Sequence, residues 1–170
     1  MSFEFRNLYL VDGNNVMGQR VGWHRDKPAA RRQLLEDLAR LARAKRARLA
    51  VVFDGAPEPN IPDGSSYRGV KVFYARPGSD ADRRIMEIVE HERNRQGLVV
   101  VTSDRALTAR VRANGVRVIR SGAFRRLLEE TPEPAAQSDE PAMHDDEMAE
   151  WLRYFGVADE TDGDEEQAGR

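Results

Sequence analysis

Five aspartates in this sequence stand where a predicted strand ends or a predicted helix begins. Asp12, Asp54 and Asp104 close three separate apolar runs, and Asp80 and Asp82 open a helical pattern that follows a fourth. Carboxylates brought together repel one another and raise each other's pKa, and a divalent cation relieves that repulsion. Carboxylate oxygens suit Mg²⁺ or Mn²⁺, and paired ions of this kind cleave phosphodiesters. The pattern therefore predicts metal-assisted hydrolysis.

The elements that carry these acids alternate between strand and helix. Strands are predicted over residues 7–12, 48–55, 69–75, 98–104 and 116–119, and helices over residues 28–47, 79–97, 105–115 and 121–130. Unbroken apolar strands are typical of a parallel sheet covered on both faces. Right-handed crossovers place the carboxyl ends of such strands on one edge, where ligands bind. The predicted fold is an α/β, three-layer α/β/α sandwich with a mainly parallel, roughly five-stranded sheet.

Each acid also has a structural explanation. Asp12 and Asp54 precede glycine and can form turns. Asp80, like its neighbour Ser79, and Asp104 are placed to cap helices, and Asp82 in a first turn favours the helix dipole. The coincidence of all five on one edge favours a metal site, with Asp12, Asp82 and Asp104 as catalytic residues. Asp54 and Asp80 are predicted as additional ligands.

Other polar side chains fall near the same edge and are candidates for binding substrate. Asn14 and Asn15 either hold a phosphate or satisfy backbone groups in a turn, and Thr102 and Ser103 carry hydroxyls there. Arginines that contact a phosphate backbone give affinity without reading sequence. The candidate arginines are Arg20, Arg25, Arg68, Arg83, Arg84 and Arg105. Stacking candidates are Trp23, Tyr67 and Tyr74, and Trp23 is equally explained as packing over the sheet edge.

Composition excludes several classes of site. The chain has no cysteine, so it has no disulfides, thiolate zinc sites or thiol catalysis. His24, His91 and His144 fall in a loop, a helix and the tail, and make no triad with a serine. Zinc is not expected at a site without histidine. No GxGxxG follows the first strand, and no second aspartate stands two residues from Asp12, which argues against dinucleotide binding and against an aspartyl phosphatase.

Charge is unevenly distributed along the chain. Residues 1–130 carry 25 Lys and Arg against 16 Asp and Glu, and residues 131–170 carry 2 against 13. A basic body suggests a polyanionic partner, although an arginine-rich surface explains it equally well. Neither a signal peptide nor a membrane span is predicted, so a cytoplasmic protein is expected.

The C-terminal part divides into three predicted segments after a domain of residues 1–130. Residues 131–143 form a Pro/Ala/acidic linker, 144–156 a short amphipathic helix, and 157–170 a disordered acidic tail. The helix either docks on the body as an additional core element or recruits a partner. The acidic end either solubilises the protein or occupies the basic surface when no partner is bound.

The motifs "LVDGNNV", "VVFDG", "SDADRRI" and "VVTSDR", in that order, resemble the YacP-like group of the NYN domain family, within the PIN-like nucleases. The resemblance extends from Asn7 to about Glu130. It implies a PIN-like fold, a metal-dependent ribonuclease site and an RNA substrate; some members are ribosome-associated endoribonucleases acting on mRNA. Asp12, Asn15, Asp82 and Asp104 match the motif residues. Two positions depart from the family pattern: Asn14 replaces an aromatic residue, and Asp80 is an additional acid.

The resulting functional hypothesis is a metal-dependent endoribonuclease. The alternative is an NYN module that binds RNA or the ribosome and cleaves nothing. Intact acids argue for the enzyme.

Overall fold

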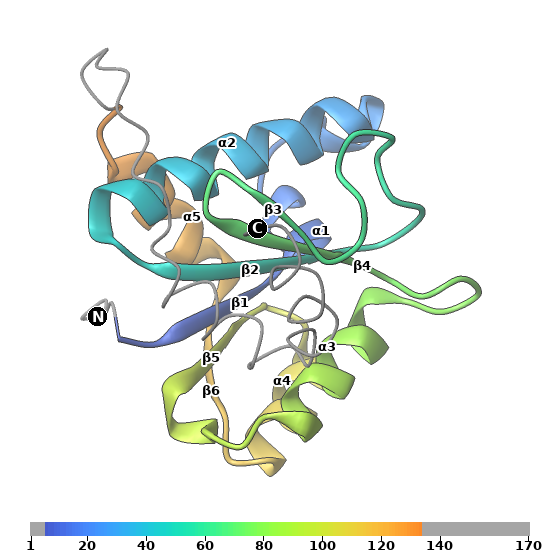
Figure 1. Cartoon of the computed structure of the whole chain (residues 1–170), viewed down its shortest axis with the longest axis vertical. Helices are drawn as coiled ribbons and strands as arrows, with labels where there is room; N and C mark the ends of the chain where they lie inside the picture. Colours follow the sequence, from blue (N-terminus) through green and yellow to red (C-terminus); the bar gives the residue numbers. More distant parts are fainter. Residues whose placement is uncertain (1–5, 134–170) are drawn as a thin grey trace, which may run out of the picture. The chain divides into compact units, whose positions relative to one another are not determined.

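The computed structural model describes residues 6–133, which form a sheet with helices on both faces (Figure 1). The strands are β1 (Leu8–Asp12), β2 (Arg48–Phe53), β3 (Ser65–Tyr67), β4 (Val70–Tyr74), β5 (Leu98–Val101) and β6 (Arg117–Ile119). The α-helices are α1 (Gly13–Met17), α2 (Lys27–Lys45), α3 (Ala81–His91), α4 (Arg105–Ala113) and α5 (Ser121–Glu130), and the 3-10 helices are η1 (Trp23–Arg25) and η2 (Arg95–Gly97). The predicted segments 144–156 and 157–170 lie outside the described residues, as does most of the linker.

The sheet has six strands in the order β3-β4-β2-β1-β5-β6. All neighbouring pairs are parallel except β3 with β4. The predicted mainly parallel α/β architecture is therefore confirmed. Chain order reverses at β1, which lies between β2 and β5, and such a reversal is where open α/β sheets bind ligands.

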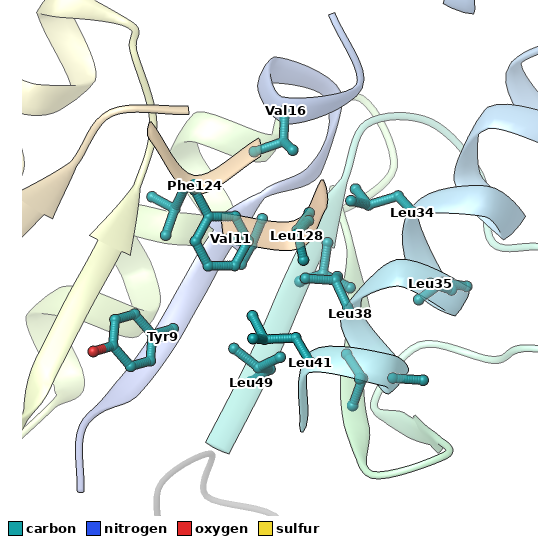
Figure 2. Packing of buried hydrophobic residues seen from close by; sticks show 14 of the residues in the cluster. Tyr9, Val11, Val16, Leu34, Leu35, Leu38, Leu41, Leu49, Phe124 and Leu128 are labelled. Atoms are coloured by element: carbon teal, nitrogen blue, oxygen red, sulfur yellow. The ribbon is translucent and has the colours of Figure 1, made fainter. Parts of the chain in front are cut away.

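One face of the sheet packs against α1, α2 and α5. Side chains alternate along a strand, so Tyr9 and Val11 enter this core while Leu8 and Leu10 face the opposite way. Figure 2 shows the core under α2 and α5, where every labelled side chain is buried. The labelled residues are Tyr9, Val11, Val16, Leu34, Leu35, Leu38, Leu41, Leu49, Phe124 and Leu128. The face opposite is covered by α3 and α4.

Strand β3, helix α1 and the 3-10 helix η1 were not predicted. Strand β3 arises within the Pro- and Gly-rich stretch predicted as a loop, and pairs antiparallel with β4 from Ser65 to Tyr67. Its residues are only partly buried, so it carries no apolar run to detect. Helix α1 follows Asp12 directly and is only five residues long, too short for a periodic pattern.

The predicted C-terminal end of the helix over residues 79–97 is wrong. It stops at His91, and Glu92 and Asn94 turn the chain: the Glu92 carboxylate accepts from the Asn94 amide at 2.7 Å. The stretch after Val89 has no apolar residue at helical spacing until the next strand, so continuing the helix would bury nothing. The sequence also suggests Ser121 as the cap of the helix predicted over residues 121–130, but Arg120 occupies that position, without a side-chain hydrogen bond.

Candidate acidic active site

The first acid, Asp12, ends β1 and is 4% exposed. Strand parity places it on the side of Leu8 and Leu10, toward α3 and α4. Its Oδ2 accepts a hydrogen bond from Thr102 Oγ1 at 2.9 Å. Thr102 is the first residue after β5, so this bond joins the two strands at the point where chain order reverses. The predicted catalytic acid therefore lies at the expected ligand-binding position of the fold.

Asp12 is hard to ionise at this position. Its pKa is raised to about 7, first by burial and then by the nearby charges of Asp82 and Asp54, against the lowering effects of the Thr102 hydroxyl and of a weaker contact with the Asn15 backbone. The pKa of Asp82 is also raised, first by burial and then by repulsion from Asp104, Asp80 and Asp54, with Arg110 opposing. The five predicted acids therefore share one electrostatic neighbourhood.

Three of the five acids also hold the ends of helices. Asp54 Oδ1 accepts from the Ala81 amide at 2.7 Å and so ties the end of β2 to the start of α3. Asp80 Oδ1 accepts from the Arg83 amide, and Asp104 Oδ1 from the Leu107 amide, each at 2.8 Å. The capping explanations for Asp80 and Asp104 are therefore confirmed. These bonds use one oxygen of each carboxylate and are compatible with a second role.

The glycines after Asp12 and Asp54 explain the turns without the acids. A Cβ on Gly13 would lie 2.6 Å from Phe53 Cδ1, so only glycine lets α1 start this close to β2. Gly55 has a φ of +82°, a left-handed conformation that favours glycine. The glycines meet the steric demands of both turns, and Asp12 has no side-chain bond that caps α1.

The two asparagines link the strand ends. Asn14 Oδ1 accepts from the Asp54 amide at 3.0 Å. Asn15 Oδ1 accepts from the Ser103 amide at 2.8 Å and from Ser121 Oγ at 2.6 Å. Both carbonyl oxygens are thus used within the fold, as the structural explanation expects, and contact with a ligand falls to the side-chain NH₂ groups. Sequence reasoning missed Ser121 in this network, because its position at the start of α5 suggested a helix cap.

The carboxylates fit a hard cation in chemistry but are not gathered around one point. Among residues 6–133, no three His, Asp or Glu side chains stand in an arrangement that could hold a metal ion. The acids are nonetheless close enough to raise each other's pKa, and a set of carboxylate oxygens suits Mg²⁺ or Mn²⁺ rather than zinc. The donor set fits the ion. The ligands Asp12, Asp54, Asp80, Asp82 and Asp104 stay a prediction.

The predicted arginines divide into two groups. Arg84 forms an ion pair with Asp63 at 3.3 Å and lies over the Phe73 ring, and Arg68 pairs with Glu36 at 3.2 Å. These two have partners within the fold. The other four are exposed, with Arg83 and Arg105 beside the acids at the starts of α3 and α4, and Arg20 and Arg25 beyond α1.

The stacking candidates fare differently. Tyr74 is 1% exposed and its hydroxyl donates to the Ile61 carbonyl, so its prediction as a stacking residue is wrong. The Tyr67 hydroxyl donates to Glu36. Trp23 is half-buried, with Lys27 Nζ 5.9 Å from its ring centroid. The hydroxyls of both tyrosines are thus bonded within the fold, whereas Trp23 has no hydroxyl and its ring is partly exposed. Trp23 therefore stays the candidate for stacking.

The family is decided by comparison with known proteins. A family model described as a YacP-like NYN domain matches residues 9–153. The chain belongs to the YacP-like NYN family. The match continues past Glu130, where the resemblance was expected to end, and includes most of the segment 144–156. YacP-like NYN domains are a nuclease family, so the coarse prediction of a nuclease is supported, whereas the catalytic residues and the ion stay predictions.

Solved structures agree on the fold. The crystal structure of Rae1 (YacP) from Bacillus subtilis has a TM-score of 0.57 and 23% identity, and covers 72% of this chain and 74% of that chain. A point mutant of the same protein gives a TM-score of 0.60 with 22% identity over 72% and 75%. At this identity the likeness shows the fold alone. No curated protein matches the sequence. Within residues 6–133, no helix has the length and apolar character needed to cross a membrane.

Proposed function

We propose that this YacP-like NYN protein is a metal-dependent endoribonuclease that hydrolyses RNA phosphodiesters at the acidic edge of its sheet. The observation that carries the proposal is Asp12: a buried carboxylate with a pKa of about 7, beside Asp82 and Asp54, where chain order reverses. The Thr102 hydroxyl and a weaker contact with the Asn15 backbone offset only part of the cost of that charge, so a ligand that brings positive charge explains it.

Asp12, Asp82 and Asp104 would hold Mg²⁺ or Mn²⁺, with Asp54 and Asp80 as further candidate ligands. When bound, the ion lowers the pKa of a water and neutralises charge on the phosphate. Thr102 orients the Asp12 carboxylate through its 2.9 Å hydrogen bond. The NH₂ groups of Asn14 and Asn15, whose oxygens are held within the fold, donate to the substrate phosphate.

The substrate is drawn to this edge by exposed arginines. Arg83 and Arg105 stand next to the acids in sequence and are exposed at the starts of α3 and α4. Cationic side chains of this kind hold a nucleic-acid backbone without reading its sequence. We further propose that the enzyme cuts mRNA internally, including mRNA on the ribosome, and that it acts in the cytoplasm. Both points follow the family resemblance.

The test is cleavage of long RNA and of single-stranded DNA by the full chain, with Mn²⁺, Mg²⁺ or EDTA. We expect internal cuts in RNA with either ion, none with EDTA, and loss of cutting in Asp82→Asn. The matched control is Glu90→Gln, an exposed acid near the other end of α3, which should cut normally. Cutting that survives EDTA, or that Asp82→Asn retains, contradicts the proposal.

A non-catalytic RNA-binding module is the second candidate. It is favoured by the helix-capping bonds of Asp54, Asp80 and Asp104, and by the lack of a gathered ligand set among residues 6–133. If the wild-type chain and Asp82→Asn bind RNA equally and neither cuts it with any ion, the module is correct and the nuclease is not.

A further inference from the structure

A pocket lies on the other face of the sheet from the acids. It has a volume of about 340 Å³ and is formed by α1, the segment that follows it, the first turns of α2, and α5. Helices α2 and α5 both begin at the carboxyl edge of the strands, so the pocket opens near the edge that carries Asp12. Helix α1, which starts at Gly13 and is about 7 Å long, separates the two sites.

The pocket is cationic. Arg20, Arg25 and Arg125 line it, against a single lining acid, Asp26. The Asp26 carboxylate is used to cap α2, where it accepts from the Ala29 amide at 3.1 Å. A pocket with three guanidinium groups and one committed carboxylate favours an anionic ligand.

Arg125 is unusual for a residue that lines a pocket, because it is only 6% exposed. Its Nη1 donates to Asp37 at 3.1 Å, yet its Nε has no hydrogen-bond partner. Burial lowers the pKa of Arg125, and the nearby charge of Arg20 lowers it further. An unsatisfied buried donor beside a second cation is what an incoming phosphate or base oxygen would relieve.

The rest of the lining is suited to a flat apolar group. Trp23 is half-buried at the pocket, and Lys27 Nζ lies 5.9 Å from its ring centroid. Val21, also in the lining, is fully exposed, and among residues 6–133 it is the one large apolar side chain so placed. An aromatic side chain beside a cationic cleft is typical of surfaces on which unpaired bases stack.

We propose that this pocket binds one unpaired nucleotide of an RNA strand, with the base on Trp23 and the phosphate on Arg20 and Arg125. The inference rests on the proposed function in taking RNA as the substrate, and deepens it. The RNA strand passes over α1, so a nucleotide held in this pocket fixes which neighbouring phosphodiester reaches the acids. A duplex does not bind in this way because its bases are already stacked, so the enzyme prefers single-stranded RNA.

The test uses Trp23 as its own reporter. The chain has two tryptophans, so Trp151→Phe leaves Trp23 as the only one. In that background with Asp82→Asn, a short single-stranded oligoadenylate should quench Trp23 fluorescence saturably, and a duplex of the same length should not. Binding by anisotropy should weaken roughly tenfold in Trp23→Ala and in Arg20→Ala. The matched control, Arg112→Ala, removes an exposed arginine in the last turn of α4 and should bind normally.

The outcomes separate this inference from the nuclease proposal. RNA that is cut by the wild-type chain but does not quench Trp23 overturns the pocket alone. Quenching without cutting overturns the nuclease alone, and neither signal overturns both. Two further results would overturn the pocket as a nucleotide site. One is that Arg20→Ala and Arg112→Ala weaken RNA binding equally. The other is that Trp23 fluorescence rises when residues 134–170 are deleted but does not respond to RNA.

Discussion

Two aspartates of this protein are equally buried but have opposite surroundings. Asp37 of α2 is 3% exposed, and three side chains hold its carboxylate: Arg125 at 3.1 Å, Arg40 at 3.3 Å and Gln33 at 3.1 Å. Asp12 of β1 is 4% exposed and is held by the Thr102 hydroxyl and a weaker contact with the Asn15 backbone, while the negative charges of Asp82 and Asp54 lie nearby.

The difference shows that burial does not make a carboxylate structural or functional. A buried charge is tolerated when it is paired and hydrogen-bonded, as Asp37 is. Asp12 lacks that compensation, so in the absence of a ligand it weakens the fold at neutral pH. A carboxylate that costs stability points to a function, and the function that we propose at this position is cation binding.

The largest effect is expected at the paired aspartate. Asp37→Ala leaves Arg125 and Arg40 buried without their carboxylate, and we expect a loss of about 3–5 kcal/mol in the free energy of unfolding. Urea denaturation followed by circular dichroism measures it, with the exposed Glu90→Gln as the control. A loss below about 1 kcal/mol would mean that Asp37 is no better compensated than Asp12, and the contrast would fail.

The charge of Asp12, in contrast to that of Asp37, should lower the free energy of unfolding. Its pKa is about 7 in the folded protein against 3.8 as a model value, so between these pH values the folded state binds more protons than the unfolded state. The free energy of unfolding of the metal-free protein should therefore fall as pH rises from about 4 to about 7.

Asp12→Asn cannot ionise and its amide oxygen still accepts from Thr102. We expect it to be more stable than the wild type above pH 7 in EDTA, by roughly 1–3 kcal/mol after relaxation, and to lose the pH dependence that Asp12 contributes. Thermal unfolding across pH compares the two proteins. A less stable Asp12→Asn at neutral pH would show that the carboxylate is compensated within the fold.

The smallest effect concerns the hydrogen bond that Asp12 receives from the Thr102 hydroxyl. Thr102→Val removes the hydroxyl that lowers the pKa of Asp12, so that pKa should rise above its wild-type value of about 7. Thr102→Ser keeps the hydroxyl and is the matched control. Carbon-13 NMR of the labelled carboxylate follows both titrations, and identical curves would remove Thr102 from the account.

Sequence reasoning located the edge but not its internal contacts. The apolar runs of β1, β2, β4 and β5 predict a parallel sheet, and the Asp that ends a run then falls on the shared edge, because strand direction alone fixes that position. The hydrogen-bond partners of Asn15 could not be predicted, because Ser103 and Ser121 lie 88 and 106 residues away along the chain and such contacts are set by packing. Strand β3 was missed because its partly buried polar residues carry no pattern.

The five acids show the same limit. Sequence placed Asp80 and Asp104 both as caps and as ligands, and the structure confirms the caps. The burial of Asp12, which decides its pKa, depends on helices that fold over it from far along the chain. No local pattern reports that burial.

The most direct test of the uncompensated charge is calorimetric titration of the full chain with Mn²⁺ at about pH 6, in buffers of different ionisation enthalpy. Because Asp12 has a pKa of about 7, the ion must displace its proton, so we predict a heat that depends on the buffer and loses that dependence at about pH 8.5. Asp12→Asn should bind at least about tenfold more weakly and release no such proton. Binding with the same heat in every buffer, equal binding by Asp12→Asn, or no binding at all would contradict the account.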